Sequence, residues 1–169
     1  NIADKLSPNA KIISVVKTDG YGHGAVPIAC ELEAKEYMHG FATATAEEAL
    51  ILRKAGIKKP ILVLGYVFPY GDEQMIQEDI RITVCREDML VQIEEEAKKQ
   101  NKKAYVHVKI DTGMGRIGIS WDFFLWIIQQ KAAFEKRSGG KSRFIPRGAE
   151  ESSCMARCMG KAMLRKERH

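Results

Sequence analysis

Two apolar segments of the chain each run into a glycine-rich stretch that carries a cation. The first is IISVVKTDGYGHG (residues 12–24), in which Lys17 directly follows the apolar run. The second is HVKIDTGMGRIG (residues 107–118), in which Arg116 stands among glycines. In α/β proteins, ligands bind beyond the carboxyl ends of the strands. If both apolar runs are strands, we expect Lys17 and Arg116 to face one site.

Lys17 stands where a lysine could act as a nucleophile. Burial at a strand end disfavours the ammonium form, and the free amine can form a Schiff base with an aldehyde. Pyridoxal 5'-phosphate is the common aldehyde cofactor held in this way. Gly20, Gly22 and Gly24 would let the backbone approach a phosphate, and Tyr21 offers a phenol as a donor. Taken alone, the loop is more typical of a surface lysine beside an ordinary strand-to-helix turn.

Polar and apolar residues alternate in the segment that precedes Arg116. Strand geometry would place the polar residues on one face and the apolar residues on the other. The polar set is Tyr105, His107, Lys109 and Asp111, and the apolar set is Val106, Val108 and Ile110. In a barrel the apolar set would meet the outer helices, and the polar set would point inward, where it needs partners. A strand with one solvated face is the alternative.

Apolar runs and helix-forming runs alternate through the first two thirds of the chain. They predict strands at 11–16, 39–43, 60–64, 81–85 and 104–110, and helices at 25–37, 45–55, 72–78 and 87–100. Thr45 and Glu48 have the spacing of a capping box, and Gly56 stands where a helix would end. The alternation indicates βαβ units and a parallel sheet, either doubly wound or rolled into a barrel.

Length and composition indicate a soluble globular protein. A chain of 169 residues is enough for one ordinary domain but short for a complete (β/α)8 barrel. No apolar run approaches the roughly 20 residues that span a membrane, and the first residues lack an apolar signal core, so we expect a cytoplasmic location. The scattered cysteines at 30, 85, 154 and 158 lack the second pair of a zinc site. We expect free thiols and no metal.

The excess of positive charge belongs to the last part of the chain. The formal net charge is +5, yet residues 1–119 carry 16 basic and 17 acidic side chains, whereas residues 120–169 carry eleven basic and five acidic ones. The body therefore gives no electrostatic reason to expect nucleic acid as a partner. In residues 120–169 we expect one further helix at 121–133 and then a basic tail that is disordered or non-native.

The two glycine-rich motifs resemble the signatures of the alanine racemase family. Residues 15–24 resemble its cofactor-lysine signature, residues 107–118 its second signature, and PILVLG (residues 60–65) its third barrel strand. The resemblance covers residues 1–119 and implies a fold III pyridoxal-phosphate enzyme whose N-terminal domain is a (β/α)8 barrel. For this chain we expect an α/β fold, a partial TIM (β/α)8 barrel with about five parallel strands and no C-terminal β domain.

The resemblance also implies roles for four side chains. Lys17 would hold pyridoxal 5'-phosphate covalently and serve as one of two catalytic bases, and Tyr21 would contact the cofactor phosphate. Arg116 matches the arginine that orients the substrate carboxylate and the second base, and Lys109 matches a lysine that supports it and is carbamylated in some members. The implied activity is the interconversion of L- and D-alanine for peptidoglycan synthesis by a homodimer. The expected partner is an amino acid, with no role for nucleic acid or a membrane.

The chain departs from the family beyond residue 119. Racemisation requires two bases on opposite faces of a planar carbanion. In the family the second base is a tyrosine from the C-terminal β domain of the partner subunit, and nothing in this sequence resembles that domain or the later barrel strands. We therefore expect the 169-residue chain alone to be an incomplete, inactive fragment.

Three alternatives stay open at this point. One is a racemase of the same fold that acts on another amino acid, such as serine. Another is a non-catalytic pyridoxal-phosphate-binding barrel, against which the loop at Lys17 and the motif at Arg116 both argue. The third is a non-enzymatic fragment whose basic tail binds acidic partners, which a steep salt dependence of binding would reveal.

Overall fold

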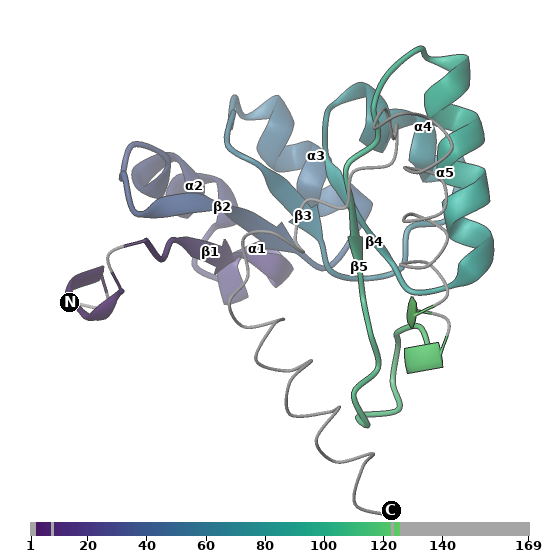
Figure 1. Ribbon diagram of the computed structural model, residues 1–169. Coiled ribbons are helices and arrows are strands. Elements are labelled where there is room, and N and C mark those ends of the chain that lie inside the picture. The colour runs from purple at the N-terminus through teal and green to yellow at the C-terminus, as the bar shows by residue number, and fades with distance from the viewer. Residues whose placement is uncertain (1–2, 8, 123, 126–169) are drawn as a thin grey trace, which may run out of the picture.

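Strands and helices alternate along the chain, in the order that the sequence predicts. The computed structural model describes residues 3–7, 9–122 and 124–125 (Figure 1). A short 3-10 helix, η1 (Ala3–Lys5), comes first. The elements that follow are β1 (Ile12–Val15), α1 (Lys17–Tyr21), α2 (Ala25–Glu33), β2 (Met38–Thr43), α3 (Ala46–Lys54), β3 (Ile61–Val63), α4 (Pro69–Gln77), β4 (Arg81–Val84), α5 (Glu87–Lys99) and β5 (Val106–Val108).

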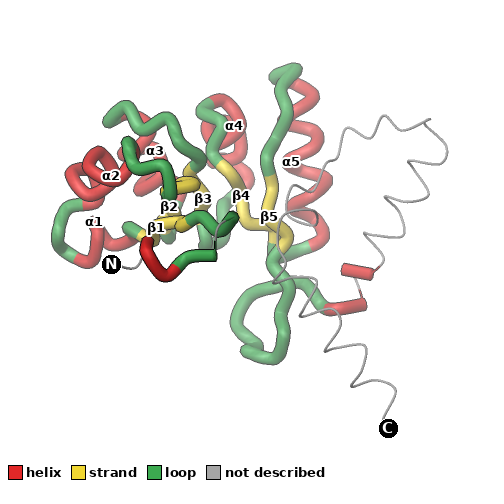
Figure 2. Tube along the Cα trace, turned by 60° about the vertical axis from the view of Figure 1, so that its left-hand side comes forward, coloured by secondary structure: helices red, strands yellow, loops and turns green. Residues whose placement is uncertain are grey.

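The strands form one parallel sheet whose spatial order, β1-β2-β3-β4-β5, is also their order in the chain. Helices α2 to α5 all lie on one face of this sheet (Figures 1 and 2). A doubly wound fold would carry helices on both faces and reverse its strand order. Sequential strands with helices on one side are instead the arrangement of a (β/α)8 barrel. The expected fold class, a five-stranded part of such a barrel, is confirmed.

The two faces of the sheet differ in burial. On the face toward the helices, most strand side chains are buried and pack in one cluster with apolar residues of α3, α4 and α5. Its largest fully buried strand members are Phe41, Ile61, Val63, Ile82 and Val84. On the opposite face, Ile13 and Val15 of β1 are 40% and 42% exposed. In a closed barrel this second face is the interior, which side chains from all strands fill.

Helix α3 begins and ends at the residues that the sequence indicates. Thr45 is the N-cap, and its hydroxyl accepts a hydrogen bond from the Glu48 amide at 3.4 Å. Ala49 and Leu52 are fully buried against the sheet, which for a side chain of leucine size contributes roughly 2 kcal/mol. Gly56 follows the helix with φ of 94°, the left-handed conformation in which glycine stops helices.

Two helix boundaries differ from the sequence prediction. Helix α4 begins at Pro69 rather than at Asp72, because proline suits the first turn, where its missing N–H is not needed. Helix α2 ends at Glu33 rather than at Tyr37. The carbonyl of Tyr37 accepts a hydrogen bond from the Ile12 amide at 2.8 Å, so this residue already belongs to the approach to the sheet.

The described residues cover only the start of the segment beyond residue 119. Residues 121–122 and 124–125 are helical, and the rest of the helix expected at 121–133 lies outside the described part, as does the basic tail. In the described ranges, none of the helices has the length and apolar character needed to cross a bilayer.

Candidate active site at the carboxyl edge of the sheet

Both sequence motifs lie at the carboxyl ends of strands, on the same edge of the parallel sheet. Lys17 follows β1, and Lys109 follows β5, whose loop continues to Arg116. Parallel strands place these ends on one side of the sheet, as expected. Because β1 and β5 are the two outer strands, β2, β3 and β4 stand between the two motifs. Within the described part, no hydrogen bond or ion pair joins Lys17 to Arg116.

Lys17 is half-buried and lies beside Tyr21. It follows Val16, which is 2% exposed and whose amide continues the sheet by donating to the Ala42 carbonyl at 2.9 Å. The Nζ atom of Lys17 lies 5.9 Å from the centre of the Tyr21 ring. The Tyr21 side chain itself is 60% exposed. The motif thus presents an amine and a phenol together at the end of β1.

The turn between Lys17 and Tyr21 is left-handed. Thr18, Asp19, Gly20 and Tyr21 have φ values of 54°, 50°, 63° and 57°. Glycine adopts this conformation without strain, whereas other L-residues pay roughly 1–2 kcal/mol each. Three non-glycine residues flank one glycine here, so the segment is strained. Such strain persists only where contacts with the surrounding structure hold the backbone in place.

Asp19 ties the left-handed turn to the start of α2. Its Oδ1 accepts a hydrogen bond from the Ala25 amide at 2.8 Å, and its backbone carbonyl accepts one from the Gly24 amide at 2.8 Å. Aspartate tolerates the left-handed region better than most residues because its short side chain can bond locally in this way. The His23 ring also stays within the loop, with Nδ1 3.2 Å from the Gly20 carbonyl.

Glu48 reaches the same turn from α3. Its Oε1 accepts a hydrogen bond from the Thr18 amide at 2.6 Å, and its Oε2 accepts one from the Ala44 amide at 2.8 Å. In a capping box this carboxylate would bond the amide of the N-cap, Thr45. The structure confirms the Thr45 half of the motif, but the carboxylate bonds two amides outside the helix. The spacing of Thr45 and Glu48 identified the right residues but could not show that long-range bond.

Backbone hydrogen bonds fold the loop after β5 back on itself. The Lys109 amide donates to the Val84 carbonyl at 2.8 Å, and the Lys109 carbonyl accepts from the Ile119 amide at 2.8 Å. Gly118 has φ of 150°, and a Cβ there would lie 2.6 Å from the Asp111 nitrogen, so only glycine fits. Lys109 is half-buried, whereas Arg116 is exposed on the loop that this pairing closes.

Asp111 organises the loop that carries Arg116. Its Oδ1 accepts hydrogen bonds from the amides of Gly113 and Gly115, at 2.9 and 3.1 Å. The bonds from Gly115 and then Gly113 lower the pKa of the Asp111 carboxyl, because they stabilise its ionised form. The sequence placed Asp111 on the polar face of the fifth strand, but its role in shaping the loop becomes visible only in the structure.

His107, on the polar face of β5, finds its partner in Arg81 of β4. Nη1 of Arg81 lies 3.4 Å from Nε2 of His39 and 3.5 Å from Nε2 of His107. A register shift between Ile12 and Ile13 adds one residue to β2 and brings His39 onto this face. Burial lowers the pKa of His107, and Arg81 and then His39 lower it further. The inward network of His107 is therefore built on Arg81, and the described contacts do not extend it to Arg116.

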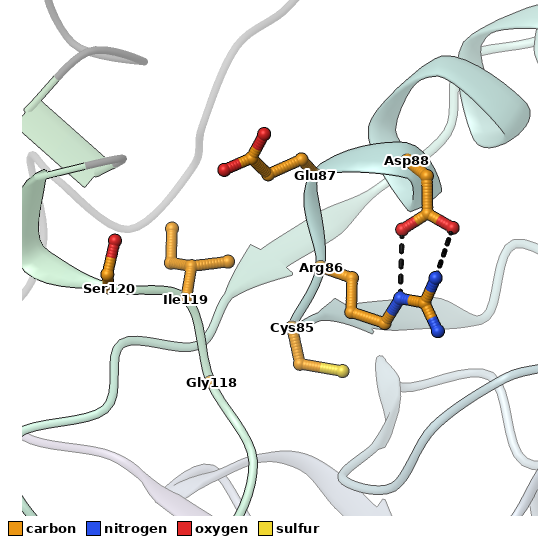
Figure 3. A pocket seen from close by; sticks show the side chains of 7 residues that line it. All are labelled: Cys85, Arg86, Glu87, Asp88, Gly118, Ile119 and Ser120. Carbon is orange, nitrogen blue, oxygen red and sulfur yellow. Dashed lines mark hydrogen bonds and ion pairs between the residues drawn. The ribbon is translucent and has the colours of Figure 1, made fainter.

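A hollow of about 530 Å³ opens at the end of β4, beside the second motif. It is lined by Cys85, Arg86, Glu87, Asp88, Gly118, Ile119 and Ser120 (Figure 3). Arg86 is held by Asp88, with nitrogen-to-oxygen distances of 2.9 and 2.8 Å. Burial raises the pKa of the Cys85 thiol, and Lys109 counteracts this. None of the four predicted site residues lines the hollow, and the described residues contain no cluster that could hold a metal ion.

Comparison with known families decides what this arrangement belongs to. Residues 1–138 match the family model described as alanine racemase, N-terminal domain. The matched range contains both motifs and all four predicted site residues. The chain belongs to the alanine racemase family. The sequence motifs indicated a resemblance over residues 1–119, and the family match extends further, to residue 138.

Curated relatives and solved structures agree with this membership. The chain is 51% identical over 113 residues to alanine racemase 1 of Caldanaerobacter subterraneus subsp. tengcongensis, covering 67% of this chain and 29% of that protein. It is 44% identical over 122 residues to the alanine racemase of Desulforamulus reducens, covering 72% and 32%. The solved alanine racemase of Clostridium difficile 630 matches with a TM-score of 0.71 and 42% identity, over 76% of this chain and 34% of that one.

Two facts limit what the family carries to this chain. The chain spans about a third of the length of these alanine racemases, 29% and 32% of the two curated relatives. A solved structure named histidine racemase, from Leuconostoc mesenteroides subsp. sake, also matches, with a TM-score of 0.67 and 26% identity over 78% of this chain and 36% of that one. The substrate and activity of this chain are therefore proposals that need their own tests.

Proposed function

We propose that the chain is the cofactor-carrying N-terminal part of a pyridoxal-phosphate-dependent amino-acid racemase whose substrate is alanine. The observation that carries the proposal is the place of Lys17. It stands half-buried at the carboxyl end of β1, beside Tyr21, in a segment that resembles the family's cofactor-lysine signature and lies within the family match. A primary amine at this edge of a parallel sheet is well placed to bind an aldehyde ligand.

The residues present fit the chemistry of pyridoxal 5'-phosphate. The aldehyde needs an amine, which Lys17 supplies, and the phosphate needs hydrogen-bond donors, of which the exposed Tyr21 hydroxyl is one. A Cβ at Gly22 would have no atom within 4 Å, so the backbone beside Tyr21 faces open space. These features leave room for an anionic group next to the phenol.

In this proposal Lys17 has two tasks: it holds the cofactor and it moves a proton at the substrate Cα. The bound cofactor supplies an electron sink for the pair left when that proton is removed. Racemisation needs a base on each face of the substrate, and Lys17 provides the base on its own side. The left-handed turn from Thr18 to Tyr21 fixes where the lysine and the phenol lie relative to each other.

Arg116 is proposed to bind the substrate carboxylate, with Lys109 supporting it. A guanidinium binds carboxylates in a bidentate manner, which orients the amino acid as well as attracting it. The structure supports this role by its place: Arg116 is exposed on a loop that Asp111 organises, at the same edge as Lys17. Lys109 lies at the base of that loop, where its backbone pairs with Val84 and Ile119.

Alanine is the favoured substrate because the curated relatives with 41–51% identity that match two thirds or more of this chain are alanine racemases. Serine or histidine would be the substrate of a related enzyme of the same fold, and the second is the named substrate of one structural relative. We also propose that the complete enzyme is a homodimer, in which the partner supplies the base for the opposite face of the substrate.

The test is covalent trapping of the cofactor on the 169-residue chain. Pyridoxal 5'-phosphate is added, borohydride reduces any imine, and mass spectrometry of the peptides locates the pyridoxyl label. We expect the label on Lys17 and its loss in Lys17→Ala. Lys54→Ala removes an exposed lysine of α3 and serves as the matched control, which should leave the label on Lys17 unchanged. Label spread evenly over surface lysines, and unaffected by Lys17→Ala, would contradict the proposal.

Substrate choice is tested by isotope exchange. The chain with pyridoxal 5'-phosphate is incubated in D2O with alanine, serine or histidine, and deuterium at Cα is measured. Exchange at Cα needs only the base on the Lys17 side, so it does not require the chain to racemise its substrate. We expect faster exchange with alanine than with the other two, and a rate in Lys17→Ala no higher than that of the free cofactor. Faster exchange with serine or histidine would assign the chain to a different racemase of the fold.

A further inference from the structure

The strained turn after Lys17 must be held by something outside itself. Its backbone bonds, from Gly20 to the Val16 carbonyl at 2.9 Å and from Gly22 to the Thr18 carbonyl at 3.1 Å, are local. Local bonds of this kind also form in right-handed turns, so they do not select the left-handed one. The side chain that reaches the turn from a distant element is Glu48, 30 residues away in the sequence.

The Glu48 carboxylate links the ends of two neighbouring strands. One oxygen accepts from the Thr18 amide at 2.6 Å, just after β1, and the other accepts from the Ala44 amide at 2.8 Å, just after β2. Glu48 is itself fixed, because Thr45 caps the amide of Glu48 at the start of α3. The sheet and the helix thus aim one oxygen of this carboxylate at the peptide group between Lys17 and Thr18.

The orientation of that peptide determines where Lys17 points. With the Thr18 amide bonded to Glu48, Thr18 has φ of 54° and ψ of 49°, and the chain turns back so that Tyr21 lies beside the lysine amine. A carboxylate with both oxygens engaged is suited to hold such a turn, because bonds to a charged acceptor are stronger than those to a neutral one.

We propose that Glu48 is a positioning residue for the cofactor lysine: it holds the Lys17–Thr18 peptide in the orientation that brings Lys17 and Tyr21 to one ligand. The effect of Glu48 on cofactor binding rests on the proposed function. Its effect on the conformation of the turn does not. Glu48 does not touch the reacting atoms and acts through the backbone of the turn.

Glu48→Gln is the sharpest substitution, because it keeps the size of the side chain. The amide offers one oxygen, so its NH2 group must face one of the two backbone N–H donors, and that bond is lost. Glu48→Asp keeps the charge but shortens the reach by one methylene, and serves as the conservative second variant. Each variant is compared with two controls. One shares with Glu48 its charge in the first turn of α3, and the other shares its bonds to two backbone amides.

The controls separate positioning from charge and from general stability. Glu47→Gln removes an exposed carboxylate from the same first turn of α3, and so repeats the change in charge. Glu33→Gln removes a carboxylate that also accepts two backbone amides, those of Lys58 and Lys59 at 2.5 and 2.9 Å. Glu33 is the last residue of α2, and the two amides that it accepts precede β3, at the amino ends of the strands, whereas Lys17 lies at the carboxyl ends.

The experiment measures two quantities on the 169-residue chain. Hydrogen exchange reports the protection of the backbone amides, and titration with pyridoxal 5'-phosphate, followed by borohydride trapping, reports the affinity of Lys17. For Glu48→Gln we expect about tenfold faster exchange at whichever of the Thr18 and Ala44 amides loses its bond, and about tenfold weaker binding of the cofactor. Glu33→Gln should speed exchange at Lys58 and Lys59 instead, and both controls should bind the cofactor within about twofold of wild type.

The outcomes distinguish the two proposals. Unchanged affinity in both Glu48 variants, or an equal loss in Glu33→Gln, would overturn the role of Glu48 while leaving the function of Lys17 in place. A wild-type chain that is not labelled at Lys17 would overturn the proposed function. In that case the exchange rates at residues 18–22 still test whether Glu48 holds the turn. Equal protection of these amides in wild type and in the Glu48 variants would refute that role. Rescue of exchange and affinity by Glu48→Asp relative to Glu48→Gln would support a role for the carboxylate charge.

Discussion

The amine of Lys17 lies 5.9 Å from the centre of the Tyr21 ring, across a turn in which the intervening residues are left-handed. In a right-handed helix, residues four apart also face each other, but the chain would then continue directly into α2. The left-handed turn reverses the chain first, and the chain enters α2 only at Ala25. Both side chains are thereby kept at the carboxyl edge of the sheet.

Gly20 is the residue of the turn that tolerates substitution least. A Cβ at this position would lie 2.9 Å from Cδ1 of Ile28 and 3.3 Å from the Ala25 nitrogen, at φ of 63°. We expect Gly20→Ala to lower the free energy of unfolding by about 2 kcal/mol or more, because contact and backbone strain add. Gly22→Ala meets no atom within 4 Å and should cost about 1 kcal/mol from strain alone. Urea unfolding measures both, and equal losses would show that the contact with Ile28 is relaxed without cost.

Asp72 makes the stability of the fold depend on pH. Its side chain is buried, its Oδ1 has no hydrogen-bond partner among the described residues, and burial, with Glu96 nearby, raises its pKa to about 6. Because the unfolded chain releases this proton near pH 3.8, the folded form loses stability progressively as the pH rises from that value through the folded pKa of about 6. The shift of about two pKa units corresponds to about 3 kcal/mol at neutral pH.

Asp72→Asn should remove this penalty. We expect the variant to match wild type at about pH 4 and to be more stable by up to about 3 kcal/mol above pH 7, as measured by urea unfolding across the pH range. Glu73→Gln, which neutralises an exposed acid of the same helix turn, is the control and should leave the pH dependence unchanged. If the free energy of unfolding varied with pH in the same way for wild type and Asp72→Asn, Asp72 would not be the source of the pH dependence.

The sheet was predictable because its signals are local and repeated. Short apolar runs, separated by helix-forming segments, identify all five strands and their parallel arrangement, and the two motifs place Lys17 and Arg116 at the carboxyl edge. The alternation of polar and apolar residues around His107 also gave the correct inward face. This pattern could not identify the partners of His107. Arg81 and His39 lie on other strands, and the position of His39 depends on a register shift.

The conformation of the turn after Lys17 was not predictable from its own residues. Threonine and aspartate rarely adopt positive φ, and the bond that holds Thr18 comes from Glu48 through the pairing of β1 with β2. The sequence pattern predicted that Glu48 belongs to a local capping box, because its spacing from Thr45 fits that motif. Likewise, nothing in the pattern around Asp72 shows that this carboxylate is 3% exposed. Tertiary contacts decide both cases.

Arg81 should contribute to the lowered pKa of His107. Burial is the largest cause of the lowered His107 pKa, and the adjacent Arg81 and His39 add to it. A lowered histidine pKa means that the neutral form stabilises the fold, and that this contribution is lost as the pH falls through the histidine range. We expect Arg81→Gln to raise the His107 pKa toward its ordinary value in an NMR titration of the imidazole protons. Arg86→Gln, at an exposed pair with Asp88, should leave it unchanged.

Asp111 should determine the order of the loop that carries Arg116. Among the described residues no hydrogen bond or ion pair holds the Arg116 guanidinium, so its place depends on the backbone of the loop. That backbone is bonded by Oδ1 of Asp111 through the amides of Gly113 and Gly115. Removal of this acceptor in Asp111→Ala should therefore speed hydrogen exchange at both glycines, by about tenfold or more.

The comparison with Asp111→Asn separates the acceptor from the charge. Asparagine keeps an Oδ1 that can accept both bonds, so exchange at Gly113 and Gly115 should stay closer to wild type than in Asp111→Ala. Because these bonds lower the pKa of Asp111, acid should loosen the wild-type loop only as the pH falls through that lowered value, whereas Asp111→Asn should show no such step. Equal exchange in all three proteins would show that the pairing of Lys109 with Ile119 suffices to shape the loop, and that Arg116 does not depend on Asp111 for its position.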